Sequence, residues 1–101
     1  MTLWFVWDPV KAETNRRKHG VSFETAKLVF ADPFALSDPD RIDGGEQRWQ
    51  TIGSVGGVVV LLVAHTVIDH DDGEETIRII SARAATSAER RRHEQEKQSQ
   101  L

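Results

Sequence analysis

The sequence predicts an α+β domain in which one antiparallel sheet carries two N-terminal helices and one C-terminal helix. Strand-like runs fill residues 48–83, and helix-capping signals occur before and after them. Runs of strands next to runs of helices are typical of this fold class. The chain has 101 residues, of which 39% are hydrophobic, so it has enough apolar surface for one modest core. We expect a single domain over residues 1–95.

The N-terminal segment predicts a strand followed by a helix. Residues 3–7 are aromatic and β-branched, which suits a half-buried strand. Asp8 is a good N-cap, and Pro9 is tolerated at the first helical position because its missing amide proton would have no partner there. A helix over about residues 9–18 follows, and Gly20 suits the left-handed cap that closes it.

A second helix and an edge segment come next. Ser22 is suited to the N-cap, and apolar side chains recur after it at helical spacing: Phe23, Ala26 and Phe30. Asp32-Pro33 ends this helix. Residues 34–45 are rich in Asp, Pro and Gly, which predicts a short edge strand that runs into a mobile loop.

The second half of the chain predicts a three-stranded meander. Residues 48–54, 58–68 and 75–83 are the strands, and the second is apolar enough to be central. Gly56-Gly57 and residues 70–73 supply the two turns. His65 lies in the central strand, where we expect it to have a hydrogen-bond partner in the core or on a sheet face.

A third helix is predicted at the C-terminus. Thr86 and Glu89 have the spacing of a capping box, in which a hydroxyl and a carboxylate each accept from a backbone amide. We expect the helix to run to about Gln95 and residues 96–101 to be frayed.

Composition limits the classes of protein to which the chain can belong. It has no cysteine, and its longest apolar run covers only residues 58–64, whereas a membrane span needs roughly 20 residues. The N-terminus lacks the basic region of a secretory signal. We therefore expect a cytoplasmic protein with no membrane association. The acids of residues 69–75 do not match the spacing of a calcium loop, and we expect neither a metal ion nor a cofactor.

Charge is unevenly distributed along the chain. The net charge is -3, which by itself disfavours nucleic-acid binding. Residues 1–31 carry +2 and residues 76–101 carry +3, whereas residues 32–75 carry -8. If the two ends meet in space, a basic surface can coexist with an acidic whole.

Two long stretches and a weaker middle pattern resemble the BrnT family of type II toxins, over about residues 5–93. The first stretch comprises Phe5-Val6-Trp7-Asp8, Lys11, Asn15, Lys18-His19-Gly20-Val21-Ser22-Phe23 and Ala26. The second comprises Ile77-Arg78-Ile79-Ile80-Ser81-Ala82-Arg83-Ala84 and Glu89, and the middle pattern comprises Glu46, Arg48 and Gly53. One position departs from the family, because His93 stands where the family often has a tyrosine.

This resemblance implies a RelE-like fold and a metal-independent endoribonuclease activity that inhibits translation and growth. It also implies inhibition by a BrnA-type antitoxin, which would bind DNA as a dimer and form a 2:2 complex with the toxin. The alternative is a non-catalytic module that binds a protein or a nucleic acid, with a degenerate active site. The departure at His93 favours that alternative if a phenol at this position carries the acid-base chemistry.

RNA cleavage without a metal ion uses the adjacent 2′-hydroxyl as nucleophile. It needs a base, an acid for the leaving 5′-oxygen, and cations for the charge that builds up on phosphorus. Arg48 and Arg83 are our catalytic candidates on the strands, and Arg78 is a candidate for phosphate binding. All three could instead be solvated strand charges. Positions 78 and 83 also have opposite parity, so they share a face only if a bulge lies between them.

The first helix supplies further candidates. Lys18 and His19 are catalytic candidates in its last turn, and Lys11 is a candidate for phosphate binding near the same face. A histidine suits proton transfer near neutral pH. Cations in this turn are also stabilised by the helix dipole, which is an alternative that needs no function.

The last helix supplies Glu89 and His93 as catalytic candidates. They lie four residues apart, so the carboxylate could orient the imidazole. The alternative for Glu89 is the capping box alone, and for the pair it is an ordinary surface hydrogen bond. The tryptophans at positions 4, 7 and 49 could stack bases, and we expect Trp4 to be partly exposed because it and Trp7 have opposite parity on one strand.

Overall fold

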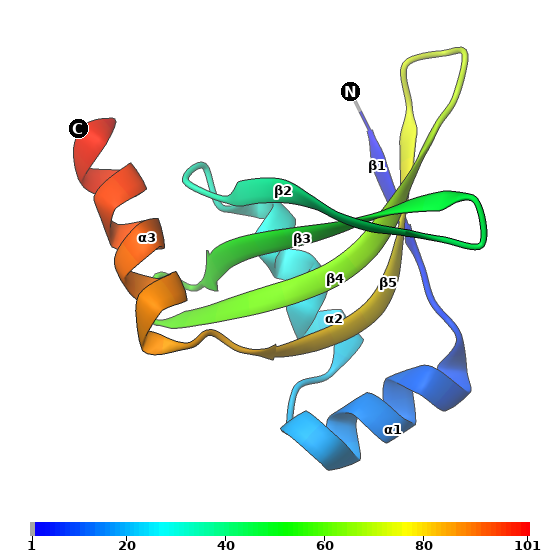
Figure 1. The fold of residues 1–101 in the computed structure, drawn as a ribbon, viewed down its shortest axis with the longest axis horizontal. Coiled ribbons are helices and arrows are strands. Elements are labelled where there is room, and N and C mark those ends of the chain that lie inside the picture. The colour runs from blue at the N-terminus through cyan, green and yellow to red at the C-terminus, as the bar shows by residue number, and fades with distance from the viewer. Residues whose placement is uncertain (1) are drawn as a thin grey trace.

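Five strands form one sheet in the order β1-β5-β4-β3-β2 in the computed structural model, which describes residues 2–101 (Figure 1). The elements in chain order are β1 (Leu3–Val6), α1 (Pro9–His19), α2 (Phe23–Ala26), the 3₁₀ helix η1 (Lys27–Ala31), β2 (Leu36–Asp43), β3 (Glu46–Val55), β4 (Val59–Asp69), β5 (Glu75–Ala84) and α3 (Ser87–Ser99). The predicted α+β class is confirmed, including the antiparallel meander of β3, β4 and β5.

The sheet differs from the prediction at its first edge. β1 pairs with β5 in parallel, with Phe5 beside Ile77 and Val6 beside Arg78, so the sheet is mostly but not wholly antiparallel. All other neighbouring strands are antiparallel. The two ends of the chain therefore meet in the sheet, and β1 lies alongside the strand that leads to α3 (Figure 1).

The core lies on the sheet face that α2 and η1 cover. Their side chains pack against β4 and β5 in a cluster of buried residues: Phe23, Ala26, Val29, Leu61, Val63, Ile77, Ile79 and Ala82. On β3, a Cβ added at Gly53 would lie 2.6 Å from Val29 Cγ1. Only glycine therefore lets η1 approach the sheet this closely.

Asn15 fixes α1 along β5. β1 ends at Val6, which leaves the second half of β5 without a strand partner on that side among residues 2–101. The side chain of Asn15 takes that place, because its Nδ2 donates to the carbonyl of Ala82 at 2.9 Å and its Oδ1 accepts from the amide of Ala82 at 3.0 Å. Asn15 is only 6% exposed.

Three segments differ from their predicted extents. The second helix changes from α to 3₁₀ geometry after Ala26, a common way for a short helix to tighten at its end. Residues 36–43 form a full strand, which tolerates Pro39 because β2 is at the edge of the sheet. Helix α3 continues to Ser99, so residues 96–99 are helical where the sequence predicted a frayed tail.

None of the helices found in residues 2–101 is long and apolar enough to cross a membrane.

Candidate active site

The sheet face opposite α2 and η1 carries the three arginines that the sequence singled out on the strands. A β-bulge explains how they come to share it: His65 pairs with Ile79, but Ala64 pairs with Ser81, so Ile80 is an extra residue in β5. The extra residue shifts the alternation of side chains between positions 78 and 83. Arg78 and Arg83 therefore project from the same face, which we call the open face.

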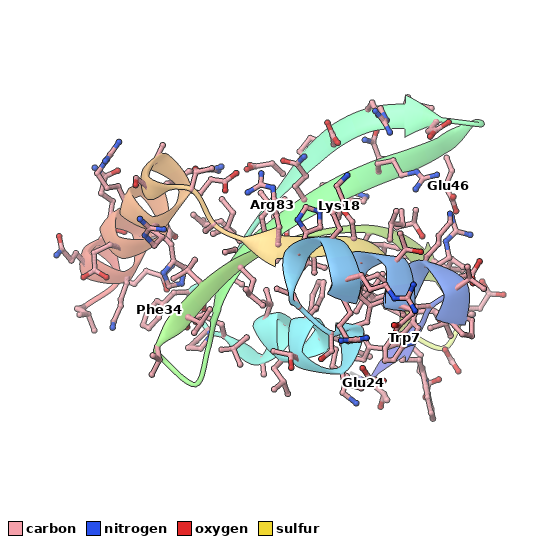
Figure 2. All side chains as sticks on the ribbon, turned by 90° about the horizontal axis from the view of Figure 1, so that it is seen from below. Trp7, Lys18, Glu24, Phe34, Glu46 and Arg83 are labelled. Carbon is pink, nitrogen blue, oxygen red and sulfur yellow. The ribbon has the colours of Figure 1, made fainter. Side chains whose placement is uncertain are left out.

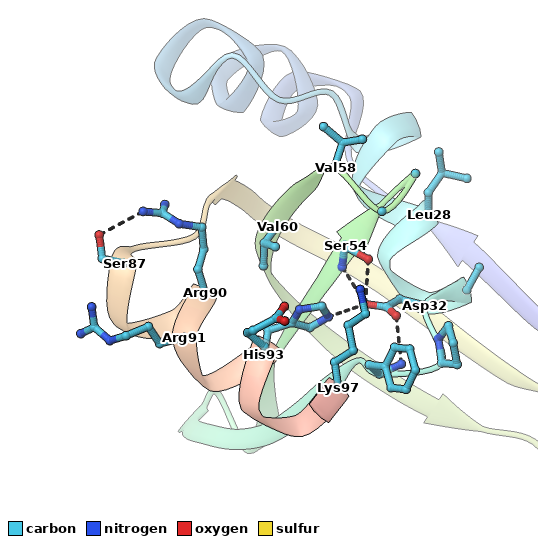
Figure 3. Close-up of a pocket in the computed structure, with 16 residues that line it drawn as sticks. Leu28, Asp32, Ser54, Val58, Val60, Ser87, Arg90, Arg91, His93 and Lys97 are labelled. Carbon is cyan, nitrogen blue, oxygen red and sulfur yellow. Dashed lines mark hydrogen bonds and ion pairs between the residues drawn. The ribbon is translucent and has the colours of Figure 1, made fainter. Parts of the chain in front are cut away.

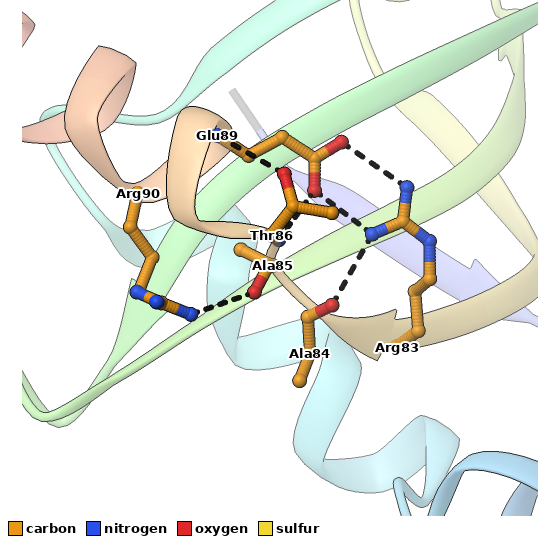
Figure 4. Close-up of polar contacts among 6 residues, drawn as sticks. All are labelled: Arg83, Ala84, Ala85, Thr86, Glu89 and Arg90. Atoms are coloured by element: carbon orange, nitrogen blue, oxygen red, sulfur yellow. Dashed lines mark hydrogen bonds and ion pairs between the residues drawn. The ribbon is translucent and has the colours of Figure 1, made fainter.

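Arg83 and Glu89 form a two-pronged ion pair between the end of β5 and the start of α3 (Figure 4). Nη1 of Arg83 donates to Oε1 of Glu89 at 2.8 Å, and Nη2 donates to Oε2 at 3.1 Å. The hydrogen bond from Arg83 lowers the pKa of Glu89, and the same contact raises the pKa of Arg83. Both groups are therefore charged, and Glu89 is not poised to release a proton near neutral pH.

Glu89 also completes the predicted capping box. Its Oε1 accepts from the amide of Thr86 at 2.8 Å, and its own amide donates to Oγ1 of Thr86 at 3.2 Å. The cap and the ion pair thus share one carboxylate. The alternatives for Glu89 were a cap and a place in the site, and this geometry combines the cap with a contact that holds Arg83.

One edge of the Arg83 guanidinium remains available. Its Nη1 also donates to the carbonyl of Ala84 at 3.2 Å, which together with Glu89 accounts for three of its five N–H donors. Nε of Arg83 has no hydrogen-bond partner within residues 2–101 and lies on the same edge as Nη2. This edge has the geometry that binds two oxygens of one phosphate, and 37% of the side chain is exposed.

A row of side chains on α1 borders the open face. Lys11, Asn15 and Lys18 recur at spacings of four and three residues, so they share one side of the helix. Because Asn15 is bonded to β5 at Ala82, the two lysines lie on either side of that contact along the strand. Figure 2 shows Lys18 and Arg83 projecting toward the same side of the molecule.

Lys11 joins Arg48 and Arg78 around a small hollow of about 260 Å³, which Asp8, Ile79 and Ile80 complete. Two acids that flank the turn between β2 and β3 accompany these cations. Arg48 lies 3.5 Å from Asp43, and Arg78 forms an ion pair with Glu46. Three basic side chains therefore line the hollow, and two of them contact carboxylates. A phosphate bound there could take the place of those carboxylates as the partner of the arginines.

His93 lies apart from both groups of cations. It is 5% exposed, and its Nε2 lies 2.7 Å from Oδ2 of Asp32, the residue that ends η1. The same oxygen accepts from the amide and the hydroxyl of Ser54, at 2.7 and 3.1 Å. Burial alone raises the pKa of Asp32, but hydrogen bonds from two backbone amides and from His93 outweigh it and hold the pKa below its ordinary value.

The predicted pairing of Glu89 with His93 is therefore wrong. Glu89 turns toward Arg83 and His93 turns toward Asp32, although the two residues are one helical turn apart. The contact between His93 and Asp32 fastens α3 to β3 and η1. Arg92 adds a second anchor, because it forms an ion pair with Asp38 on β2.

A groove of about 930 Å³ runs between α3 and the end of η1 (Figure 3). One wall is apolar and comprises Leu28, Ala31, Pro33, Phe34, Val58 and Val60. The other wall is the polar side of α3, with Arg90, Arg91 and Lys97. His93 also lines this groove, whereas Arg83 and Glu89 do not.

The structure therefore divides the predicted site residues among four places. Arg83 and Glu89 are in contact, with Lys18 bordering the same side, whereas Lys11, Arg48 and Arg78 surround the hollow farther along β5. His93 is buried on the side of α3 that faces Asp32, and His19 is exposed at the end of α1. Sequence reasoning missed the roles of Asp32 and Asn15. The first was interpreted only as a helix end, and the second belonged to the BrnT-like pattern without an assigned role.

Comparison with known proteins adds a family and a fold. Residues 7–89 match the family described as "Ribonuclease toxin, BrnT, of type II toxin-antitoxin system". The 1.1 Å crystal structure of the ribonuclease toxin BrnT from Brucella abortus aligns with a TM-score of 0.64 and 25% sequence identity, over 86% of this chain and 100% of that chain. No curated protein matches the sequence.

Proposed function

The chain belongs to the BrnT family of ribonuclease toxins of type II toxin-antitoxin systems, and we propose that it cleaves RNA internally without a metal ion. The observation that carries this proposal is the arginine that Glu89 holds in place on the open face. Arg83 keeps a free two-donor edge toward solvent, and Lys18 borders the same side. Cationic side chains that are already in place stabilise the negative charge that develops on the phosphate in the transition state without having to reorganise.

In the proposed reaction the 2′-oxygen of the RNA attacks the adjacent phosphorus. The proton of the 2′-hydroxyl passes to a base, the bond from phosphorus to the 5′-oxygen breaks, and that oxygen takes a proton from an acid. The products are a 2′,3′-cyclic phosphate and a 5′-hydroxyl. Arg83 binds the phosphate oxygens as negative charge builds on them, and Lys18 supplies a second cation. His19, exposed beside Lys18, is the proposed proton-transfer group.

The other predicted residues take supporting roles in this proposal. Glu89 positions Arg83, while Lys11, Arg48 and Arg78 bind a neighbouring phosphate of the same RNA. His93 is a structural anchor for α3, since its Nε2 is engaged by Asp32 and its side chain is 6% exposed. A tyrosine at this position is then not required for cleavage.

We also propose that a BrnA-type antitoxin neutralises the chain in the cytoplasm. It would form a 2:2 complex that binds DNA through the antitoxin. An acidic antitoxin segment that covers the cations of the open face would block RNA and would be attracted to them.

Expression in bacteria tests this function. The wild-type chain should arrest growth, co-expression of the cognate antitoxin should restore growth, and Arg83→Ala should be tolerated at equal protein level. A wild-type chain that accumulates without slowing growth would contradict the toxin assignment and favour a binding module.

A further inference from the structure

Trp4 lies on the open face, at the opposite end from α3. The parallel register places Trp4 beside Thr76 and Val6 beside Arg78, so Trp4 and Val6 share the face of Arg78. Phe5, between them, packs against the core instead. Trp4 is 54% exposed, which agrees with the partial exposure expected from the sequence.

The exposed indole is held in one orientation. Its Nε1 donates to Oε2 of Glu74 at 2.8 Å, which satisfies its only polar atom. Two further apolar side chains of the open face are also exposed close to it, Val6 at 46% and Ile68 at 43%. By contrast, Trp7 packs edge-on against Phe23 with ring centroids 6.0 Å apart. Trp4 therefore presents an aromatic surface that the fold itself does not use.

This aromatic surface adjoins the cations around the hollow. Ile68, Thr76 and Trp4 form one row across β4, β5 and β1, and Thr66, Arg78 and Val6 form the next row. Arg48 extends the second row on β3, since the neighbouring Trp49 pairs with His65. Rows on one face are about 7 Å apart. A base on Trp4 and its phosphate on Arg78 are within reach of a single nucleotide.

The charges around Trp4 favour a base over a phosphate there. Acids surround this end of the sheet: Asp69, Asp71, Asp72, Glu74 and Glu75. They disfavour a phosphate at the indole, whereas the cations around the hollow attract one. Arg83 lies three rows from Trp4, about 20 Å away, so one strand several nucleotides long can contact both.

We infer that Trp4 is a nucleobase-stacking site and that the substrate of this chain is single-stranded RNA lying along β5. This inference rests on the proposed function and names its substrate class. An unpaired base stacks on the indole, the next phosphate lies in the hollow of Lys11, Arg48 and Arg78, and the scissile phosphate reaches Arg83. A base paired within a duplex cannot stack in this way.

Binding of an uncleavable strand tests the inference without relying on catalysis. The probe is a single-stranded RNA of eight nucleotides in which every 2′-hydroxyl is methylated, so the nucleophile is absent. Titration of the wild-type chain should quench tryptophan fluorescence. Trp4→Ala should weaken binding about 5- to 150-fold. Trp4→Phe should retain most of the affinity but lose the quenching, although Trp7 and Trp49 remain.

Two controls separate stacking from other effects. Leu28→Ala removes a side chain that is 48% exposed on η1, on the opposite side of the sheet, and should bind like the wild type. A blunt duplex of the same sequence should bind the wild type and Trp4→Ala equally.

Equal binding of the single strand by wild type and Trp4→Ala would overturn the inference. The inference would also fail if Trp4→Ala lost as much affinity for the duplex as for the single strand. Binding through Trp4 by a chain that cuts no RNA would overturn the proposed function and leave the stacking site intact.

Discussion

Both carboxylate oxygens of Glu89 accept hydrogen bonds from the guanidinium of Arg83, from Nη1 at 2.8 Å and from Nη2 at 3.1 Å. The same carboxylate also caps α3. The end of β5 and the start of α3 thus hold Arg83 in a single orientation. The free edge of the guanidinium faces away from the carboxylate. A side chain that is already oriented loses little conformational entropy when it binds a phosphate.

The shape of the Arg83 side chain is expected to matter as much as its charge. Arg83→Lys keeps the charge but has no planar pair of donors, so kcat for RNA cleavage should fall by about 10²- to 10³-fold. The free energy of unfolding should change by about 1 kcal/mol or less, because the ion pair is partly exposed. Cleavage by Arg83→Lys at the wild-type rate would show that a diffuse positive charge suffices.

The two roles of Glu89 can be separated. Glu89→Gln retains the capping box, since glutamine serves in it, but removes the charge opposite Arg83. Cleavage should fall about tenfold with little loss of stability. Thr86→Ala is the matched control. It removes the hydroxyl of the cap and should cost about 1 kcal/mol of stability without slowing cleavage by folded protein. If Glu89→Gln lost stability but cleaved like the wild type, and Thr86→Ala slowed cleavage, Glu89 would act only as a cap.

His93 is expected to contribute to stability rather than to proton transfer. His93→Gln loses the hydrogen bond to Asp32 and leaves that buried carboxylate short of one partner, so the free energy of unfolding should fall by about 1 to 3 kcal/mol. The pH profile of kcat for the folded variant should match that of the wild type. Loss of one limb of that profile would instead make His93 an acid or base of the reaction.

His65 makes the fold sensitive to acid. It lies in the sheet interior, with Nε2 2.7 Å from Oγ1 of Thr51, and burial lowers its pKa to about 4. The unfolded chain binds a proton near pH 6.5 and the folded chain does not. The stability that neutral His65 contributes is therefore fully present above pH 6.5. As the pH falls from 6.5 to 4, the free energy of unfolding decreases by about 3 kcal/mol. Chemical denaturation from pH 7 to pH 4 measures it.

The control for this pH dependence is His65→Gln, which removes the titrating group. Its stability at pH 7 can be lower than that of the wild type, but it should fall less between pH 6.5 and pH 4. Parallel curves for the two proteins would assign the acid sensitivity to another group.

Local signals predicted most elements because caps and turns depend on neighbouring residues. Asp8, Ser22 and Thr86 are all N-caps in the structure. The parallel pairing of β1 with β5 was not predictable in this way, because it joins residues about seventy positions apart. The bulge at Ile80 was not predictable either. It depends on the register between β4 and β5, yet it decides that Arg78 and Arg83 share a face.

The candidate site was predicted only in part for the same reason. Residue types and neighbouring strands indicated the cations Arg48, Arg78 and Arg83. Their partners were harder to find, because Asp32 and His93 meet across 61 positions of the sequence. The helical spacing of Glu89 and His93 suggested a contact between them. Tertiary packing instead gave each residue a different partner.

Incubation of a labelled single-stranded RNA with the purified chain in excess EDTA tests the central claim most directly. The account predicts internal cleavage by the wild type, with a 2′,3′-cyclic phosphate on the upstream fragment and a 5′-hydroxyl on the downstream one, and no cleavage of the 2′-O-methylated strand. An intact RNA in EDTA, or fragments that carry a 5′-phosphate, would contradict it.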